Sequence, residues 1–238
     1  MIIGNSQADN TKYLRPVVIN IYPHDQSVYT QGLLYHDGTF LESAGLYGRS
    51  RLRQTKIGSG RVVRELKLDD RYFAEGLALV DQVLLQLTWR RGVLLRYRLE
   101  DFLPLQPIFY TGEGWGLCFD GKEVLMSDGT HILSYRDSRT FEIRKQIPVI
   151  LAGKPVKLLN ELECVAGLVY ANVWQSDEIM VIEKTSGQVR AVIDASALLT
   201  PAERKTADVL NGIAYNPQKE TFYLTGKFWP KVFEVRFE

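Results

Sequence analysis

The sequence is poor in the residue types that most often carry metals and covalent catalysis. Its 238 residues include two cysteines and three histidines, and His24, His36 and His131 are far apart. A histidine zinc cluster is therefore not expected. The chain also lacks a Cys-x-x-Cys pair, a Gly-x-Ser-x-Gly elbow, a Walker loop and a Rossmann glycine fingerprint. An acid-only calcium or magnesium site at Glu161 and Glu163 is left open.

An excess of charge of one sign and long hydrophobic runs are missing as well. The 29 basic and 28 acidic residues leave a formal net charge of +1, so we expect neither a nucleic-acid nor a membrane partner. No apolar run is long enough to span a bilayer. Residues 1–13 are polar and lack the hydrophobic stretch of a signal peptide. The expected location is periplasmic or secreted if a signal peptide has been removed, and cytoplasmic otherwise.

What the chain does contain is a short signal that occurs five times: a polar or aromatic residue, usually followed by glycine, and then an apolar strand. The five copies are Gln31-Gly32-Leu33-Leu34, Glu75-Gly76-Leu77-Ala78, Trp115-Gly116-Leu117-Cys118, Glu161-Leu162-Glu163-Cys164 and Asn211-Gly212-Ile213-Ala214. A period of about 40 to 50 residues that carries four short strands is typical of a β-propeller.

Each repeat divides into four short strands separated by turn signals such as His36-Asp37-Gly38. In the first repeat the expected strands are residues 32–35, 39–43, 50–56 and 62–68. The last repeat ends at its third strand, residues 233–237, and residues 16–21 are expected to supply the fourth. The prediction is an all-β, single-domain, five-bladed β-propeller over residues 1–238. Each blade has four antiparallel strands, and residues 1–13 form a flexible extension.

This topology predicts that one face of the ring collects chemically active side chains. In an up-and-down blade, the start of the first strand and the turn after the second strand lie on the same face. That face gathers polar groups and large aromatic rings, including all four tryptophans: Gln31, Glu75, Trp89, Trp115, Asn160, Trp174, Asn211, Lys227 and Trp229.

Not all of these residues are expected to act on a ligand. Glu161, Glu163 and Asn211 are more simply explained as hydrogen-bond partners of a neighbouring blade, and Trp229 as a packing residue. Glu75 differs, because a carboxylate among Phe73, Trp89 and Trp115 would be partly desolvated. Desolvation raises a carboxyl pKa towards the range that is useful for proton transfer.

The two cysteines, Cys118 and Cys164, occupy corresponding positions in the third and fourth repeats. Neighbouring blades could bring them together, but two cysteines do not make a disulfide framework. We expect two buried free thiols in the innermost strands.

The motifs at these positions, taken together, closely resemble those of the plant and bacterial glutaminyl cyclases (glutaminyl-peptide cyclotransferases). The matching segments follow one another along nearly the whole chain: residues 29–33 (YTQGL), 41–48 (LESAGLYG), 73–77 (FAEGL), 87–89 (LTW), 112–117 (GEGWGL), 127–130 (SDGT), 159–163 (LNELE), 171–174 (ANVW), 208–215 (DVLNGIAY) and 225–231 (TGKFWPK). Tyr29 departs from the pattern mildly, since phenylalanine is frequent there.

The resemblance implies a five-bladed propeller that converts the N-terminal glutamine of peptides and proteins to pyroglutamate, without a metal or other cofactor. It implies Glu75 as the general base and then the general acid, with Gln31, Asn160, Trp115 and Lys227 as donors to substrate carbonyl groups. Tyr29, Phe73, Trp89 and Trp174 would form the walls that bind the substrate. A monomer is expected. Two other readings are left open: a non-catalytic propeller that binds peptide N-termini or sugars, and a metal-dependent propeller hydrolase or lactonase.

Overall fold

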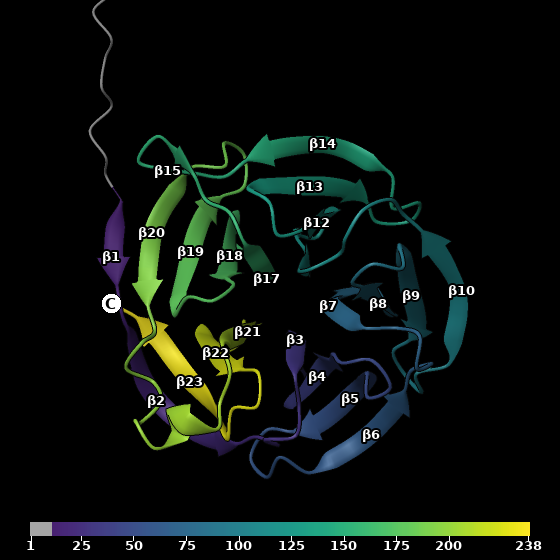
Figure 1. Ribbon diagram of the computed structural model, residues 1–238, viewed down its shortest axis with the longest axis horizontal. Helices are drawn as coiled ribbons and strands as arrows, with labels where there is room; N and C mark the ends of the chain where they lie inside the picture. Colours follow the sequence, from purple (N-terminus) through teal and green to yellow (C-terminus); the bar gives the residue numbers. More distant parts are fainter. Residues whose placement is uncertain (1–10) are drawn as a thin grey trace, which may run out of the picture.

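Five antiparallel sheets are arranged around a central axis in the computed structural model, which describes residues 11–238 (Figure 1). Each sheet is one blade, and its first strand is the innermost. This confirms the predicted five-bladed all-β propeller with four antiparallel strands in each blade. No helix within residues 11–238 is long and apolar enough to cross a membrane.

The strands follow the repeats in order. Blade 1 contains β3 (Thr30–His36), β4 (Thr39–Ala44), β5 (Arg51–Lys56) and β6 (Val62–Lys67). Blade 2 contains β7 (Ala74–Val80), β8 (Val83–Thr88), β9 (Val93–Arg98) and β10 (Pro104–Phe109). Blade 3 contains β11 (Leu117–Phe119), β12 (Glu123–Met126), β13 (Ile132–Asp137) and β14 (Ile143–Pro148). Blade 4 contains β17 (Leu159–Val165), β18 (Leu168–Val173), β19 (Glu178–Glu183) and β20 (Val189–Asp194).

Blade 5 joins the two ends of the described chain. It contains β21 (Leu210–Asn216), β22 (Thr221–Gly226), β23 (Lys231–Phe237) and, as its outer strand, β2 (Pro16–Pro23). The antiparallel pairing of β2 with β23 continues past their ends, where Arg15 N donates to Glu238 O at 2.7 Å. The predicted closure is therefore present, and it pairs the edge that β23 would otherwise expose.

Blade 4 carries a fifth strand that the sequence reasoning did not anticipate. Strand β1 (Lys12–Leu14) pairs in parallel with β20, so Lys12 and Tyr13 do not belong to a flexible extension. The rest of that predicted extension, residues 1–10, lies outside the described residues. Two small elements complete the described chain: the hairpin of β15 (Ile150–Leu151) with β16 (Lys154–Pro155), and the short 3₁₀ helix η1 (Glu203–Lys205) in the loop between β20 and β21.

The core lies between neighbouring blades. Inner strands such as β4 and β8 are buried on both faces, and β8 is largely apolar, whereas the outer strand β14 is mostly exposed. Each pair of adjacent blades encloses its own hydrophobic cluster; Leu41 and Leu77, for example, lie between blades 1 and 2. The five clusters hold the innermost strands in fixed positions around the axis.

A register shift marks the start of the innermost strand in four blades. Pairing is interrupted between Thr30 and Gly32, Ala74 and Leu77, Leu159 and Leu162, and Leu210 and Ile213. Such a bulge re-aims a side chain and ends regular pairing. The residues at the bulges correspond in position: Gln31, Glu75, Asn160 and Asn211.

This correspondence corrects the fourth copy of the sequence signal by one residue. Asn160, not Glu161, is the counterpart of Gln31, and Glu161 stands where the other blades have glycine. Glycine is needed in blade 3 because a Cβ on Gly116 would lie 1.8 Å from Asn160 O. Glu161 instead directs its carboxylate across the axis, where it accepts hydrogen bonds from Leu33 N at 3.2 Å and Ile213 N at 2.9 Å.

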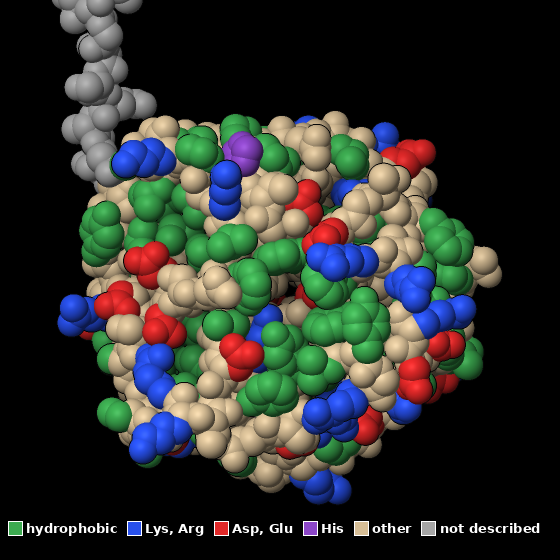
Figure 2. Space-filling view, viewed as in Figure 1, with side chains coloured by type: hydrophobic (Ala, Val, Ile, Leu, Met, Phe, Trp, Pro, Cys, Tyr) green, Lys and Arg blue, Asp and Glu red, His purple; other side chains and the backbone are tan. Residues whose placement is uncertain are grey.

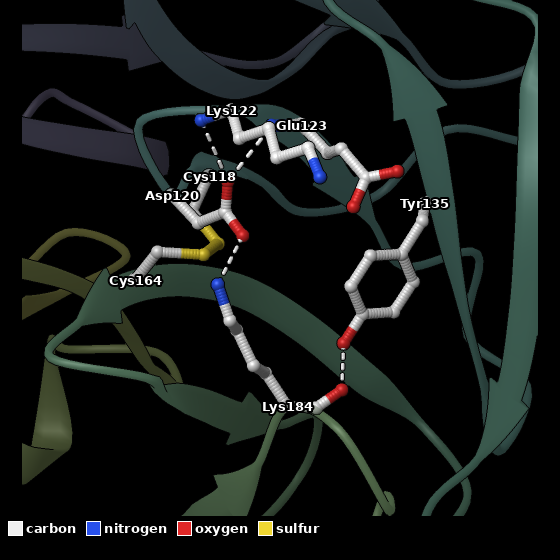
Figure 3. The surroundings of a disulfide bond; sticks show 7 residues. All are labelled: Cys118, Asp120, Lys122, Glu123, Tyr135, Cys164 and Lys184. Atoms are coloured by element: carbon white, nitrogen blue, oxygen red, sulfur yellow. Dashed lines mark hydrogen bonds and ion pairs between the residues drawn. A yellow bond between two sulfur atoms is a disulfide. The ribbon is translucent and has the colours of Figure 1, made fainter.

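Cys118 and Cys164 form a disulfide, so the expectation of two free thiols is wrong (Figure 3). The cysteines lie on β11 and β17, which are adjacent innermost strands, and their Cα atoms are 5.5 Å apart. That spacing is within the range a disulfide requires. An ion pair of 2.5 Å between Lys184 and Asp120 joins blades 3 and 4 beside it, and Tyr135 donates to the carbonyl of Lys184.

The closure of blade 5 makes a prediction for truncated protein. Deleting residues 1–22 removes most of β2 and leaves the β23 edge unpaired, so the shortened chain should aggregate. Size-exclusion chromatography measures the soluble fraction, with a deletion of residues 1–10, which keeps β1 and β2, as the control. A soluble, active protein that begins at residue 23 would contradict this role for β2.

Candidate active site

One pocket opens at the end of the axis where the innermost strands begin. Its volume is about 200 Å³. In the space-filling view, hydrophobic side chains surround a hollow near the centre of this face (Figure 2). The lining consists of the nine residues that the sequence singled out: Tyr29, Gln31, Phe73, Glu75, Trp89, Trp115, Asn160, Trp174 and Lys227. The structure brings all nine together, and their catalytic and binding roles are still predictions.

Glu75 lines this pocket, and only 4% of the residue is exposed. Burial raises its pKa well above the usual range, the charge of Lys227 and a hydrogen bond from Gln31 act to lower it, and Glu113 raises it slightly. A carboxyl group in this setting can hold a proton at a pH where an exposed glutamate is ionised. It is therefore suited to accepting a proton and returning it.

Lys227 supplies the cation of the pocket. It follows β22, is 2% exposed, and places Nζ 4.6 Å from the centre of the Tyr29 ring. Burial lowers the pKa of its ammonium group, while the charges of Glu75 and Asp208 act in the opposite direction. The pocket thus contains one acid and one amine that are both desolvated, beside an aromatic face that favours a cation.

A short relay of amides orients Gln31. Asn211 Nδ2 donates to Thr30 O at 3.0 Å and to Gln31 Oε1 at 3.2 Å. With its oxygen occupied in this way, the Gln31 amide presents its nitrogen to Glu75, in agreement with the hydrogen bond to that carboxyl group. Asn211 therefore bonds the neighbouring blade, as expected, and also fixes the direction of a residue that lines the pocket.

Asn160 offers an acceptor. Its side chain is 3% exposed, and Oδ1 has no hydrogen-bond partner among the described residues. Its main-chain oxygen is held by Ser127 Oγ at 2.6 Å, which fixes the residue at the bulge. A buried amide oxygen without a partner is costly unless a ligand supplies a donor. The sequence reasoning treated Asn160 as a donor, whereas the structure leaves its oxygen available.

The aromatic walls contact one another through ring edges. Phe73 is central, with ring centres 6.1 Å from Tyr29, 5.4 Å from Tyr47 and 5.6 Å from Trp89. On the other side, Trp115 packs against Trp174 at 5.7 Å. Edge-to-face packing of this kind makes a stiff apolar enclosure, and Tyr47 is a member that the sequence reasoning did not assign to the walls.

Glu113 is a second residue that the sequence reasoning missed. Its Oε2 accepts hydrogen bonds from Trp89 Nε1 at 2.8 Å and Trp115 Nε1 at 3.1 Å. Arg90 pairs with its other oxygen at 2.9 Å and lies 3.8 Å from the centre of the Trp89 ring. These donors hold the Glu113 pKa below its usual range against the effect of burial. The indole N–H of Trp115 is thus bonded to Glu113, which differs from its expected use as a donor to the substrate.

Glu161 and Glu163 lie outside this pocket. Burial raises the pKa of both, that of Glu163 to about 8, and their carboxylates bond backbone amides of neighbouring innermost strands. Within residues 11–238, no group of three or more His, Cys, Asp and Glu side chains is placed to hold a metal ion. The structure gives these two acids the role of bonding neighbouring blades.

A five-bladed propeller with a buried carboxyl group in an aromatic pocket has the architecture of an enzyme. Comparisons with known proteins identify the family. The chain belongs to the glutamine cyclotransferase family, whose model matches residues 2–237. It is 38% identical over 226 residues to a glutaminyl-peptide cyclotransferase of Arabidopsis thaliana, covering 93% of this chain and 71% of that protein. It is also similar to the crystal structure of Myxococcus xanthus glutaminyl cyclase. That match has a TM-score of 0.87 and 39% identity, and it covers 96% of this chain and 98% of the other.

The position of Glu113 predicts how the tryptophan walls respond to substitution. Trp115→Phe keeps the ring but removes one donor to Glu113, and Glu113→Gln removes the charge that holds both indoles. Each should raise KM by about tenfold, the worth of a charge-assisted hydrogen bond, with kcat changed much less. The double variant should be little worse than Glu113→Gln alone, because that change already weakens the contact that Trp115→Phe removes. A loss confined to kcat in Trp115→Phe, with Glu113→Gln unaffected, would mean that the indole serves the reacting carbonyl instead.

Proposed function

We propose that this chain converts the N-terminal glutamine of a peptide or protein to pyroglutamate with release of ammonia, and that Glu75 moves the proton. The observation that carries this proposal is the buried Glu75 carboxyl group, with its raised pKa, in an aromatic pocket that also holds Lys227. Membership of the glutamine cyclotransferase family supports the same reaction.

The reaction needs one proton to change place. The α-amine must be neutral before its nitrogen can attack the side-chain carbonyl carbon, and a free α-ammonium has a pKa of about 7.7–8.0. The new C–N bond closes the five-membered ring, and the bond to the amide nitrogen then breaks. That nitrogen leaves as ammonia only after it gains a proton. A single group that takes the proton from the amine and gives it to the leaving nitrogen therefore suffices.

Glu75 is the group in this pocket that suits both steps. Ionised, it accepts a proton from the attacking amine; protonated, it is stable enough in its buried site to hold that proton until the amide nitrogen takes it. Gln31, fixed by Asn211, keeps the carboxyl group in one orientation between the steps.

The remaining polar groups stabilise the substrate. Negative charge builds up on the side-chain carbonyl oxygen as the ring closes, and the Lys227 ammonium is the cationic donor that lines the pocket. The unpartnered Asn160 oxygen can accept an N–H from the substrate. Since nucleophile and electrophile belong to one residue, most of the acceleration should come from folding that residue into a reactive shape. The walls of Tyr29, Phe73, Trp89 and Trp174 are placed to do so.

We further propose that the reaction needs neither a metal nor a second subunit. The polar groups that line the pocket include Lys227, whose positive charge opposes binding of a cation. The chemistry described above is complete with the chain's own groups.

The role of Glu75 predicts the effect of its replacement by glutamine. Glu75→Gln keeps size and hydrogen bonding but cannot accept and return a proton, so kcat should fall by roughly 10²–10⁴. Binding of a Gln-initiated peptide should change little. The wild-type rate should rise with pH as Glu75 and the substrate amine lose protons, and the component due to Glu75 should be missing in the variant. Ammonia release measured across pH checks both points.

Stability provides the control for this variant. The pKa of Glu75 is higher in the folded than in the unfolded chain, so ionising it makes the folded state less stable as pH rises above the unfolded value. Glu75→Gln should accordingly melt no lower than the wild type at pH 8. Near-wild-type turnover with an unchanged pH profile would place the base elsewhere.

Metal independence is tested by exhaustive chelation. Turnover of a Gln-initiated peptide should be unchanged after dialysis against a chelator, with the melting temperature followed in parallel to detect loss of a structural ion. Loss of turnover at constant melting temperature, restored by one added cation, would favour a metal-dependent enzyme.

A further inference from the structure

A buried histidine outside the active-site pocket forms hydrogen bonds to two segments that line the pocket. His24 follows β2, and its side chain is 8% exposed. Its Nδ1 lies 2.8 Å from the carbonyl oxygen of Trp229, and its Nε2 lies 2.9 Å from Glu42 Oε1. A carbonyl oxygen and a carboxylate both accept hydrogen bonds, and an imidazole donates from both nitrogens only when it is protonated. The geometry therefore fits an imidazolium.

The first of these segments, residues 24–31, carries Tyr29 and Gln31. Glu42 Oε1, the acceptor of His24, also accepts a hydrogen bond from Thr30 Oγ1 at 2.7 Å. Thr30 stands between the two pocket residues in the chain. Oε1 of the buried Glu42 thus bonds both His24, at the beginning of this segment, and Thr30, near its end.

The second segment carries Lys227. It is the loop between β22 and β23, and it is bound to the first segment by Phe228 N donating to Val28 O at 2.8 Å and by His24 N donating to Pro230 O at 2.9 Å. The His24 side chain adds the bond to Trp229 O, two residues beyond Lys227. Lys227 itself is bonded through its main chain to Asp208 and Val209, and the bonds made by His24 join this loop to the segment of Tyr29.

We propose that His24 is a positioning residue for the cyclisation. Its imidazolium, held between Glu42 and the Trp229 carbonyl, keeps Lys227 in register with Tyr29 and Gln31, and loss of its proton at alkaline pH lowers turnover. This inference rests on the proposed function, since turnover is its main readout.

The charged groups around His24 are compatible with a retained proton. Glu42 faces it from β4, and Arg53 of β5 pairs with Asp25 and Glu65, both at 3.0 Å. Lys56 lines the same small cavity. Burial and Arg53 act to lower the pKa of His24, but the charge of Glu42 and the two hydrogen bonds outweigh them and raise it above its usual value.

Two substitutions test the two hydrogen bonds of the His24 ring one at a time. The amide nitrogen of asparagine can occupy the place of Nδ1, and that of glutamine the place of Nε2. His24→Asn keeps the bond to Trp229 O without a titrating group, so kcat should stay within about threefold of wild type while the alkaline decline disappears. His24→Gln keeps the bond to Glu42 but releases the loop, so kcat should fall about tenfold or more, with KM changed less.

His36 provides matched controls, because it lies at the far end of β3 from the pocket and is partly exposed. His36→Asn and His36→Gln should both behave as wild type in ammonia release across pH 6–10. An alkaline decline that persists unchanged in His24→Asn would assign it to another group, such as Lys227, and overturn the proposal. Equal losses of kcat in His24→Asn and His24→Gln would also overturn it, since they would show a general packing effect.

A measurement without substrate keeps this inference distinct from the proposed reaction. In ¹⁵N-labelled protein, both ring nitrogens of His24 should be protonated at pH 7, and hydrogen exchange at the Phe228 amide should speed up at least tenfold in His24→Gln but not in His24→Asn. A neutral His24 ring at pH 7, or equal hydrogen exchange at the Phe228 amide in both variants, would contradict the positioning role of His24. Absence of ammonia release from the wild type would contradict the proposed function alone.

Discussion

The close approach of five innermost strands at one axis is the constraint on which the rest of this structure depends. The strands come so near one another that a Cβ on Gly76 would lie 2.5 Å from Leu117 N. A bulge then ends regular pairing at the start of β3, β7, β17 and β21 and turns one side chain per blade towards the face of the ring. Gln31, Glu75 and Asn160 meet in the pocket because they occupy that same position in different blades, and Asn211, at the same position in blade 5, holds Gln31 in place.

The same geometry accounts for two buried acids, Glu161 and Glu75. Glu161 takes the place of a glycine, and its oxygens bond amide groups of Leu33 and Ile213, which ties blade 4 to blades 1 and 5. Glu75 is buried among aromatic rings instead, with a side-chain amide and a lysine as its polar neighbours. Burial raises the pKa of both. Backbone donors make Glu161 part of the scaffold, whereas exposure of Glu75 to a pocket makes it available for chemistry.

The period of the sequence signal was sufficient to predict the blades, the strand that closes them and most of the polar and tryptophan residues of the pocket, because strand order fixes which side chains share a face. The complete set of nine lining residues, with Tyr29, came from the resemblance to glutaminyl cyclases. Features that depend on an offset of one residue were not predictable. The bulge that exchanges the roles of Asn160 and Glu161 leaves no mark in the hydrophobic pattern. The relative offset of β11 and β17, which brings Cys118 within reach of Cys164, is likewise set by packing between blades. Glu113 was missed because it precedes the signal by two residues, and only the fold brings Trp89 to it.

The central claim is that burial raises the pKa of Glu75, so that its carboxyl group can hold a proton at a pH where an exposed glutamate is ionised. The most direct test is a ¹³C NMR titration of the protein labelled at the glutamate carboxyl carbon, with the Glu75 signal assigned by its absence in the glutamine variant. The account predicts a Glu75 resonance that titrates well above the usual value of 4.5 for glutamate. A carboxyl group that titrates at or below that value would contradict it, because burial would then not stabilise the protonated form that holds the proton between the two steps.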